Sequence, residues 1–453
     1  MTQHRTSRTA YVALLAGSTL GTLASTLMSA PVNVIAAALG ASPRGIVLAV
    51  SAFTLAMVLT SPLAGWACER LGARRALLLA LTLMALGQAG AAASDTLGML
   101  VLMRTVQGIA CSVIPPAVQQ TLTWAWPERR GTAMAAWASA IGVGQALGPP
   151  VGGFVADLLG WRSVFALHAL LSVVLLLTLA RVAPSPPAGR PDLRLGGMTT
   201  LVLGVGSLVC AVAWVGQDGT VGVGAALVVG GAVALVLHLL LARHESTRLL
   251  DPALLTERRF LRSTAAAGTV MACLGVAIVT TPLHLGRDYG LGPGPIGAIT
   301  LSLALAMALF APVSARLSER FTARRVLQLA MLALGLSLLL LGLVSGADYG
   351  PLVVIATVAA LVCVGAAIGA VQANAAFALM RSPAAAHGAA LGVHNMMRFC
   401  GLAIGYSWVA ITIEQHSLFV VYAGPVVLVA GSLALLLGPP AAPVAPTLTE
   451  PAR

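Results

Sequence analysis

The sequence predicts an all-α membrane protein with fourteen transmembrane helices, arranged as two six-helix bundles with two additional helices between them. Three observations predict this fold class. The first is composition: 58% of the 453 residues are hydrophobic and only 9% are charged, whereas an average soluble domain is about 25% charged. The others are a series of apolar runs and an uneven distribution of arginine. Together they exclude an ordinary soluble enzyme, a disordered chain and a nucleic-acid-binding module.

The apolar runs have the length of membrane-spanning helices, which need about 20 apolar residues. They are continuous and do not alternate with polar residues, so helices fit them better than barrel strands. The first run follows a polar start without a small-residue cleavage site, which indicates a first span and not a removed signal. The fourteen runs cover approximately residues 10–37, 45–67, 76–94, 97–122, 131–156, 162–182, 196–216, 220–242, 263–285, 295–315, 326–346, 350–379, 388–411 and 418–438.

The order of the runs predicts five segments. They are a cytoplasmic N-terminus over 1–9, a six-helix bundle over 10–182, a central segment with two extra spans over 183–262, a second six-helix bundle over 263–438, and a disordered cytoplasmic tail over 439–453. The tail is assigned on its content of proline and alanine.

The arginines test this topology. All 26 basic residues are arginine, and the formal net charge is +12. With the N-terminus inside, 21 arginines fall on inside segments and 3 on outside segments, and only Arg104 and Arg398 lie within spans. Cytoplasmic loops of membrane proteins carry such an excess of positive charge. We therefore expect a multi-pass protein of the cytoplasmic membrane with both termini inside, and we attribute its basicity to topology and not to nucleic acid.

A repeat supports the division into halves. Residues 62–75 and 312–325 align without a gap, with Pro, Glu, Arg, Ala, Arg and Arg in common, and each copy follows the second span of its half. Parallel repeats of six helices are the layout of one large transporter class. The six cysteines form no C-x-x-C motif, and we interpret them as packing residues. The sequence contains no phosphate loop, no Gly-x-Ser-x-Gly elbow and no carboxylate pair within the bilayer, so no enzyme is expected.

Three motifs identify a family. The loop after the second span contains Gly65, Glu69, Arg70, Gly72, Arg74 and Arg75, with Ala73 shifting the basic run. The fourth span contains Arg104-Thr-Val-Gln107-Gly108, and the fifth contains Gly144-Gln-Ala-Leu-Gly148-Pro149-Pro150-Val-Gly152-Gly153. With these motifs the chain resembles the major facilitator superfamily, and within it the fourteen-span drug:proton antiporters. Span 13, with Arg398-Phe-Cys-Gly401-Leu-Ala-Ile-Gly405, is similar to the same pattern.

The loop motif implies a cytoplasmic gate, in which Glu69 pairs with an arginine or a helix N-terminus of the facing half. The alternative is that the arginines only anchor the topology. The second copy is expected to be a weaker latch, because Thr322 replaces its glycine; it consists of Glu319, Arg320, Arg324 and Arg325.

The fifth-span motif predicts a tight seam between two helices. Gly144, Gly148 and Gly152 recur every four residues, so they share one helix face and allow close backbone approach. Pro149 and Pro150 favour a bend there. The resemblance implies that this seam favours outward release and resists leak; the alternative is ordinary helix packing.

Arg104 and Arg398 are the charges that topology does not explain. A charge inside the membrane costs ~2.5–3.5 kcal/mol on insertion scales, so it usually faces a cavity or a partner. Gln107 lies one turn from Arg104, and His394 lies four residues before Arg398 on the same face. We expect polar sites there, with snorkelling to the headgroups as the alternative for both arginines.

No Asp or Glu lies in the middle of any span. This leaves the proton carrier open among the residues that can titrate, which are His168, His284, His394, Asp157 and Glu414. The positive charge of Arg104 and Arg398 suits a neutral or anionic substrate better than a cation.

The resemblance implies proton-coupled export of a small amphipathic molecule, such as a drug, an antibiotic or a secondary metabolite, by alternating access. The cavity is expected between spans 1, 4, 9 and 12, with Met28, Asn33, Gln119, Met271, Gln372 and Asn374 as lining residues. The expected partners are the substrate, protons and the lipid bilayer, with no nucleic acid and no cofactor, and the expected state is monomeric. An arginine-dependent uniporter or anion carrier is the main alternative, and a non-transporting receptor or scaffold is a remote one.

Overall fold

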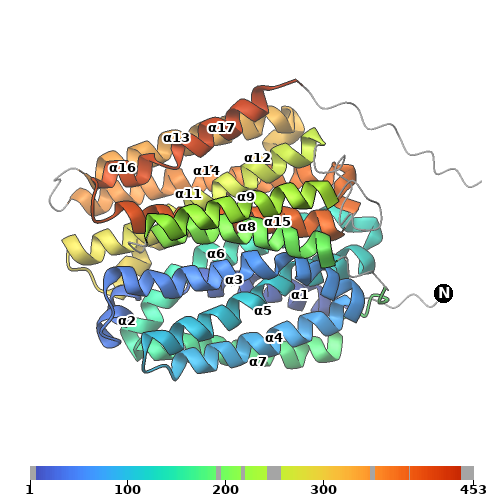
Figure 1. Ribbon diagram of the computed structural model, residues 1–453, viewed down its shortest axis with the longest axis horizontal. Coiled ribbons are helices and arrows are strands. Elements are labelled where there is room, and N and C mark those ends of the chain that lie inside the picture. The colour runs from blue at the N-terminus through green and yellow to red at the C-terminus, as the bar shows by residue number, and fades with distance from the viewer. Residues whose placement is uncertain are drawn as a thin grey trace, which may run out of the picture.

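The computed structural model describes residues 7–189, 195–215, 220–241, 257–346, 352–386 and 388–439. Within these ranges the chain is helical, without a strand. Figure 1 shows the long helices running side by side across the molecule. The predicted tail beyond Pro439 and parts of the predicted central segment lie outside the described residues.

The first half of the chain contains seven helices and a short 3-10 turn. They are α1 (Arg8–Thr26), α2 (Val32–Ala38), α3 (Pro43–Leu71), α4 (Ala73–Ala92), α5 (Leu97–Ala125), the turn Pro127–Arg129, α6 (Arg130–Leu159) and α7 (Trp161–Val182). Two further helices follow, α8 (Leu195–Val215) and α9 (Val221–Leu241).

The second half begins with a helix that is almost entirely buried. It contains α11 (Arg258–Asp288), α12 (Pro293–Arg320), α13 (Ala323–Ser345), α14 (Leu352–Met380), the turn Pro383–Ala386, α15 (Gly388–Thr412), α16 (Leu418–Ala423) and α17 (Val426–Leu437).

Several helices begin where the sequence supplies a capping side chain. The hydroxyls of Ser7, Ser42 and Thr96 accept backbone N–H groups three residues on, at 3.0–3.2 Å. Glu257 caps α11 by accepting from the backbone N–H groups of Arg259 and Phe260. Such caps satisfy N–H groups that have no partner within the helix.

Ten of the helical segments are long and apolar enough to cross a membrane. They comprise α3, α4, α5, α7, α9, α11, α12, α13, α14 and the segment Leu418–Leu437. The first, fifth, seventh and thirteenth predicted runs form helices that are not among these ten. The chain is therefore a multi-pass membrane protein with at least these ten candidate spans.

Two of the predicted runs are interrupted. The first run divides into α1 and α2 at Leu27–Pro31, and the last divides into α16 and α17 at Gly424–Pro425. Prolines stand at both breaks, where the missing N–H and the fixed ring interrupt the helical hydrogen bonds. Periodicity alone does not show these breaks, because the residues around them are apolar.

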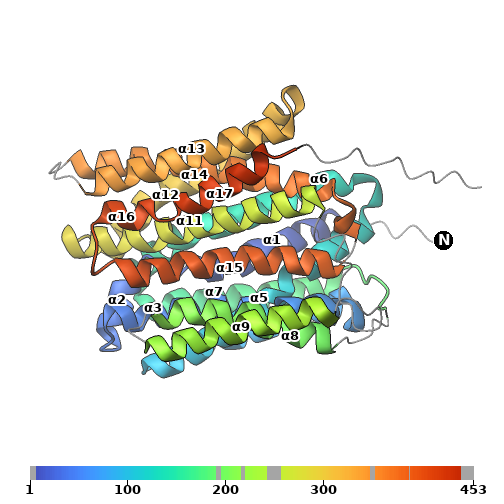
Figure 2. The same cartoon turned by 45° about the horizontal axis from the view of Figure 1, so that its top comes forward.

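The helices pack as two groups. In the first half α3 and α4 pack on α5, α4 also packs on α7, and α1 packs on α6; in the second half α12 and α13 pack on α14, and α11 packs on α15. The largest contacts between the halves are α6 with α12 and α3 with α15. The α8–α9 pair packs through α8 on α3 and α15, as Figures 1 and 2 both show.

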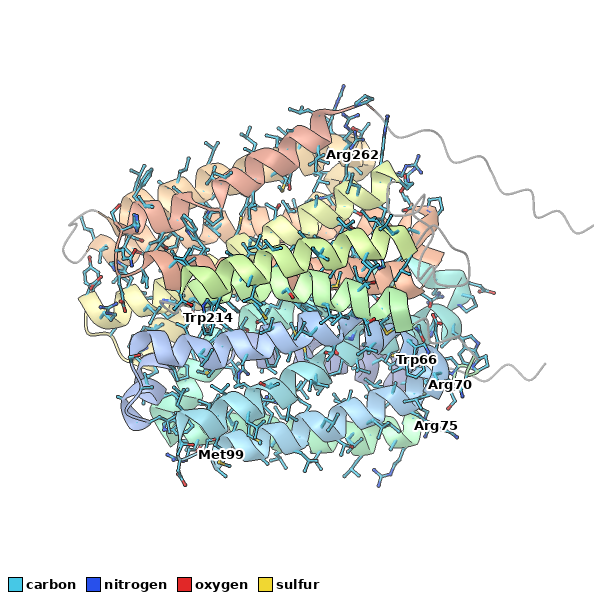
Figure 3. The ribbon with its side chains drawn as sticks, in the orientation of Figure 1. Trp66, Arg70, Arg75, Met99, Trp214 and Arg262 are labelled. Carbon is cyan, nitrogen blue, oxygen red and sulfur yellow. The ribbon has the colours of Figure 1, made fainter. Side chains whose placement is uncertain are left out.

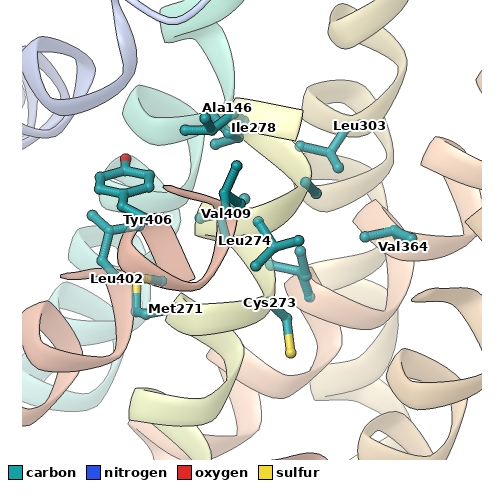
Figure 4. Packing of buried hydrophobic residues seen from close by; sticks show 14 of the residues in the cluster. Ala146, Met271, Cys273, Leu274, Ile278, Leu303, Val364, Leu402, Tyr406 and Val409 are labelled. Carbon is teal, nitrogen blue, oxygen red and sulfur yellow. The ribbon is translucent and has the colours of Figure 1, made fainter. Parts of the chain in front are cut away.

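Two apolar cores fill the interior. One contains residues of α3, α4 and α5 together with Met396 and Phe399 of α15. The other is centred on α11, where Met271, Leu274 and Ile278 pack with α6, α12 and α15 (Figure 4). Each core therefore contains residues from both halves.

Candidate functional site

The glycines of the fifth-span motif face α1. A Cβ atom on Gly144 would overlap the Thr19 carbonyl oxygen, one on Gly148 would overlap Thr26 Oγ1, and one on Gly152 would overlap the Leu27 carbonyl oxygen. The absence of side chains on this face is thus what lets α6 and α1 approach, as the four-residue spacing predicts.

The proline pair exposes backbone carbonyls on α6. Pro149 has no N–H for the carbonyl of Gln145, four residues earlier, and the Thr26 hydroxyl of α1 donates to that carbonyl instead at 2.8 Å. Thr22 Oγ1 also lies 3.2 Å from the Ile141 carbonyl, but the Ser18 carbonyl of its own helix is a nearer acceptor at 2.9 Å. The Thr26 hydroxyl therefore satisfies a carbonyl of α6 from outside the helix and joins α6 to α1.

The same motif also contacts the other half. A Cβ atom on Gly153 would overlap the Pro293 carbonyl at the start of α12, and one on Gly297 would lie 3.1 Å from Pro150 Cα. Asp157 packs one turn further on against Gly294. The α6 motif therefore lies between α1 of its own half and α12 of the other.

The second half contains a similar seam. A Cβ atom on Gly401 of α15 would overlap the Gly268 carbonyl of α11, and one on Gly405 would overlap the Ala272 carbonyl. The span-13 motif thus packs on α11 as the fifth-span motif packs on α1.

Arg104 is fully buried on α5. Its Nη1 donates to the Ala24 carbonyl of α1 at 2.9 Å and to Gln107 Oε1 at 2.8 Å, while Nε donates to the Ala49 carbonyl of α3 at 3.4 Å. The guanidinium lies 4.3 Å from the centre of the Phe53 ring, which allows a cation–π contact. Nη2 is buried without a hydrogen-bond partner among the described residues.

Gln107 and Gly108 position this arginine. Gln107 Nε2 donates to the Gly87 carbonyl of α4 at 2.9 Å, which leaves its Oε1 for Arg104. A Cβ atom on Gly108 would overlap the Phe53 carbonyl, so this glycine brings α5 against α3. The predicted triplet therefore forms one local unit that joins α1, α3, α4 and α5.

Arg398 and His394 lie on α15, and both are buried. The sequence predicts that this part of α15 lies in the cytoplasmic half of the membrane. His394 Nδ1 lies 2.9 Å from the Thr264 hydroxyl of α11, and Arg398 Nη1 donates to Asn395 Oδ1 at 3.5 Å. His394 and Arg398 thus hydrogen-bond to different polar side chains, and the polar site that they are expected to form stays a prediction.

Two arginines of the predicted gating loops bind helix ends of their own half. Arg74 donates to the Ala180 carbonyl near the end of α7, and Arg324 donates to the Leu436 carbonyl near the end of α17, the latter at 2.8 Å. Carbonyls at helix C-termini lack intrahelical partners and carry partial negative charge, which a guanidinium satisfies.

The two loops differ where the sequence differs. Gly72 has a φ of +82°, which glycine adopts without strain, whereas Thr322 is extended and caps α13 through its hydroxyl. The segment after α7 crosses the first loop, because the Gly189 N–H donates to the Glu69 carbonyl at 2.8 Å. Gly65 is buried on α3 and the Glu69 side chain is half-buried.

The remaining loop arginines lie at the surface. Arg70, Arg75, Arg320 and Arg325 are exposed, and the side chain of Glu319 lies outside the described part of the chain. In Figure 3, Arg70, Arg75 and Arg262 lie toward one end of the helical bundle and Met99 toward the other.

The predicted lining residues divide into two sets. Met28, Gln119, Met271 and Asn374 are buried, while Asn33 and Gln372 are half-buried. Gln145 Nε2 lies 3.4 Å from Met271 Sδ across the seam between the halves, and the Gln372 amide approaches Gly142 of α6. Asn33 lies instead against Gly286, and Asn374 accepts from Ser318, so neither joins the group around Met271.

Sequence reasoning missed the Gln145 side chain and the α12 contacts at Pro293 and Gly297. The Thr26 hydroxyl could have been found, because it lies on the first span and Pro149 frees the Gln145 carbonyl of α6. The α12 residues have no such signal, since their role depends on how the halves meet.

A bundle of long apolar helices in two repeated halves, with glycine seams and buried arginines, defines a membrane transporter. No group of three or more His, Cys, Asp or Glu side chains that could hold a metal exists within the described ranges. The sequence profile of the Major Facilitator Superfamily matches residues 12–248 and 263–452. The chain belongs to this superfamily, and it is a transporter and not an enzyme.

Among its relatives are proteins that carry the name "Putative multidrug resistance protein MdtD". One from Escherichia coli O6:H1 (strain CFT073) is 27% identical over 333 residues, which cover 72% of this chain and 69% of the relative. One from Shigella flexneri serotype 5b (strain 8401) has the same identity and coverage.

Proposed function

We propose that this chain exports small amphipathic molecules across the cytoplasmic membrane in exchange for protons. Its relatives are named for multidrug resistance. The observation that carries the proposal is the α6 motif, whose glycines and prolines form both the α1 seam and the α12 contact. A helix shared in this way couples movement inside one half to separation of the halves.

The proposed architecture is fourteen spans in a 6 + 2 + 6 order, with both termini cytoplasmic. Ten of these spans are the candidate spans described above, and the helices α1, α6, α8 and α15 would be the other four. α1 and α15 carry more hydroxyl, amide or charged side chains than a lipid-facing helix, which suits an interior position. The distribution of arginine supports the orientation.

Proton coupling requires a group that can titrate. Among the histidines, His168 has both ring nitrogens near partners, the Leu20 carbonyl at 3.0 Å and the Ser172 hydroxyl at 3.3 Å. His284 differs: its Nδ1 lies 2.6 Å from Asp288 Oδ2, and its Nε2 is buried without a partner among the described residues. We propose His284 and Asp288 as the pair that receives the external proton.

Inside-out vesicles test this function. Proton-coupled export predicts accumulation of substrate in the lumen that a protonophore abolishes. Replacing His284 with Gln should remove the protonophore-sensitive part, while His416→Gln, at an exposed histidine of the same end, should leave it unchanged. Accumulation indifferent to the protonophore would remove the coupling from the proposal.

A second candidate function is an arginine-dependent uniporter or anion carrier. It is favoured by Arg104 and Arg398, two buried cations with no carboxylate within 4.0 Å in the part of the chain that the structure describes. Downhill transport that needs both arginines but no proton gradient would support this function against antiport.

A further inference from the structure

Two buried arginines of the helical bundle have no carboxylate partner among the residues that the structure describes. The side chain of Arg104 is 0% exposed and that of Arg398 is 8% exposed. No carboxylate of a described residue lies within ion-pairing distance of either guanidinium. An ion inside a membrane protein usually faces a partner or a cavity, and within the described residues both arginines lack a carboxylate as counter-charge.

Arg104 also has free donor capacity. A guanidinium carries five N–H groups in a rigid fork that fits carboxylates and related oxyanions. Three of its contacts go to neutral acceptors of the first half, through Nε and Nη1. The two N–H groups of Nη2 are buried and have no described partner.

Arg104 lies where the two halves meet. Its neutral acceptors belong to α1, α3 and α5, and Tyr406 of α15 is close enough to interact with it electrostatically. Tyr406 itself packs on Gly275 of α11. Arg104 is therefore held by the first half and lies within electrostatic reach of the α11–α15 pair.

Arg398 occupies the same helix as Tyr406, further toward the end where α15 begins. Eight residues separate them, which is about 12 Å along a helix. Its neighbours Met396 and Phe399 pack in the core shared with the first half, and Leu402 packs in the core around α11. Arg398 makes one long hydrogen bond, to Asn395, whose own Nδ2 is buried without a described partner.

We propose that the exported molecule is an amphipathic organic anion, whose acidic group binds Arg398 on the inner side and Arg104 on the outer side. The apolar cores contact its hydrophobic part, and the free guanidinium and amide N–H groups bind its oxygens. A cationic substrate would add a like charge to two unpaired arginines. This inference rests on the proposed export function and names its substrate class.

The substrate charge determines which force drives transport. Moving one monovalent anion out and one proton in transfers two positive charges inward per cycle. Exchanging one monovalent cation for one proton transfers none. A membrane potential without a pH gradient therefore drives export of the anion and leaves cation exchange undriven.

Inside-out vesicles with equal pH on both sides and a lumen-positive potassium diffusion potential test the proposal. The anionic probes are carboxyfluorescein and radiolabelled salicylate, and the cationic probes are ethidium and tetraphenylphosphonium. We expect an anionic probe to accumulate in the lumen and the cations not to follow. Arg398→Gln should reduce that accumulation about tenfold, the effect of losing roughly 1.4 kcal/mol of binding.

Two further variants separate binding from folding. Arg104→Lys keeps the charge but loses the fork, so we expect weaker anion transport, together with some loss of thermal stability because the hydrogen bonds to Ala24, Ala49 and Gln107 are disturbed. Arg398→Gln, whose printed hydrogen bond to Asn395 is long at 3.5 Å, should lower anion transport with a smaller loss of stability. Arg181→Gln is the control, because Arg181 is exposed and, among the described residues, its hydrogen bond goes to the Leu177 carbonyl of its own helix.

Three results would count against the proposal. With a lumen-acid pH gradient imposed in place of the potential, transport of a cationic probe without an anionic one overturns the substrate class and leaves export standing. Anion transport that is unchanged in both arginine variants overturns the assigned residues. Transport of neither class under the potential or under the pH gradient contradicts export itself, and the substrate class with it.

Discussion

Gly148 determines how closely α6 approaches α1. The Thr26 side chain occupies the volume that a Cβ atom of residue 148 would need. The Thr26 side chain cannot move aside easily, because its Oγ1 donates a hydrogen bond to the Gln145 carbonyl at 2.8 Å. A single methyl group at position 148 would therefore force α6 and α1 apart.

We predict that Gly148→Ala lowers the thermal stability and the transport rate together. Overpacking of this kind costs about 1–3 kcal/mol. The matched control is Gly230→Ala on α9, where a Cβ atom would meet nothing within 4 Å. Thermal unfolding in detergent and vesicle uptake measure the two effects; equal behaviour of the two variants would contradict the close contact.

The hydrogen bond from Thr26 to Gln145 depends on Pro149, and this dependence can be measured. Thr26→Val should cost about 1 kcal/mol, because the Gln145 carbonyl loses its donor. In a Pro149→Ala background residue 149 regains an N–H for that carbonyl, so the same replacement should cost less. A double-mutant cycle on thermal stability gives the coupling, and strictly additive costs would show that Pro149 does not create the need for Thr26.

At the scale of helices, the repeated loop motif has a structural use in both halves. Arg74 and Arg324 occupy equivalent positions of the repeat, and each binds carbonyls at the end of the last helix of its half. The sequence predicts the repeat and its position, but not these partners, since the carbonyls belong to segments more than 100 residues away. The gating role of Glu69 stays a prediction.

We predict that Arg74 and Glu69 affect different properties. Arg74→Gln should lower thermal stability by about 0.3–1 kcal/mol, because the end of α7 loses a cation at its C-terminus. Glu69→Gln should leave stability unchanged and alter the transport rate if its carboxylate has the gating role. Thermal unfolding and uptake measure both properties for each variant. A loss of stability in Glu69→Gln but not in Arg74→Gln would mean that Glu69, and not Arg74, has the stabilising role.

For the molecule as a whole, the sequence predicts more of the fold than of the site. Continuous apolar runs and the arginine pattern indicate where helices lie and in which order, because both follow from the solvent each segment meets. The breaks at Pro31 and Gly424, the Met271–Gln145 contact and the α12 partners of α6 depend on tertiary packing. Such contacts leave no periodic signal in a chain that is apolar throughout.

The contact between the halves at α6 and α12 gives the most direct test of alternating access. A Cβ atom built on Gly294 would lie 3.4 Å from the Asp157 Cβ, close to the 3.5–4.5 Å separation of a disulfide. With native cysteines replaced, Asp157→Cys and Gly294→Cys should form a disulfide on mild oxidation. If the halves must separate at this end during transport, the bond abolishes transport and a reductant restores it.

A disulfide within one half is the matched control. A Cβ atom on Gly335 of α13 would lie 4.0 Å from the Val429 Cβ of α17, and both helices belong to the second half. Because the proposed cycle moves the halves as units, this second disulfide should leave most of the transport rate intact. Full transport with the α6–α12 bond in place would mean that the two halves need not separate there, and alternating access around this contact would have to be abandoned.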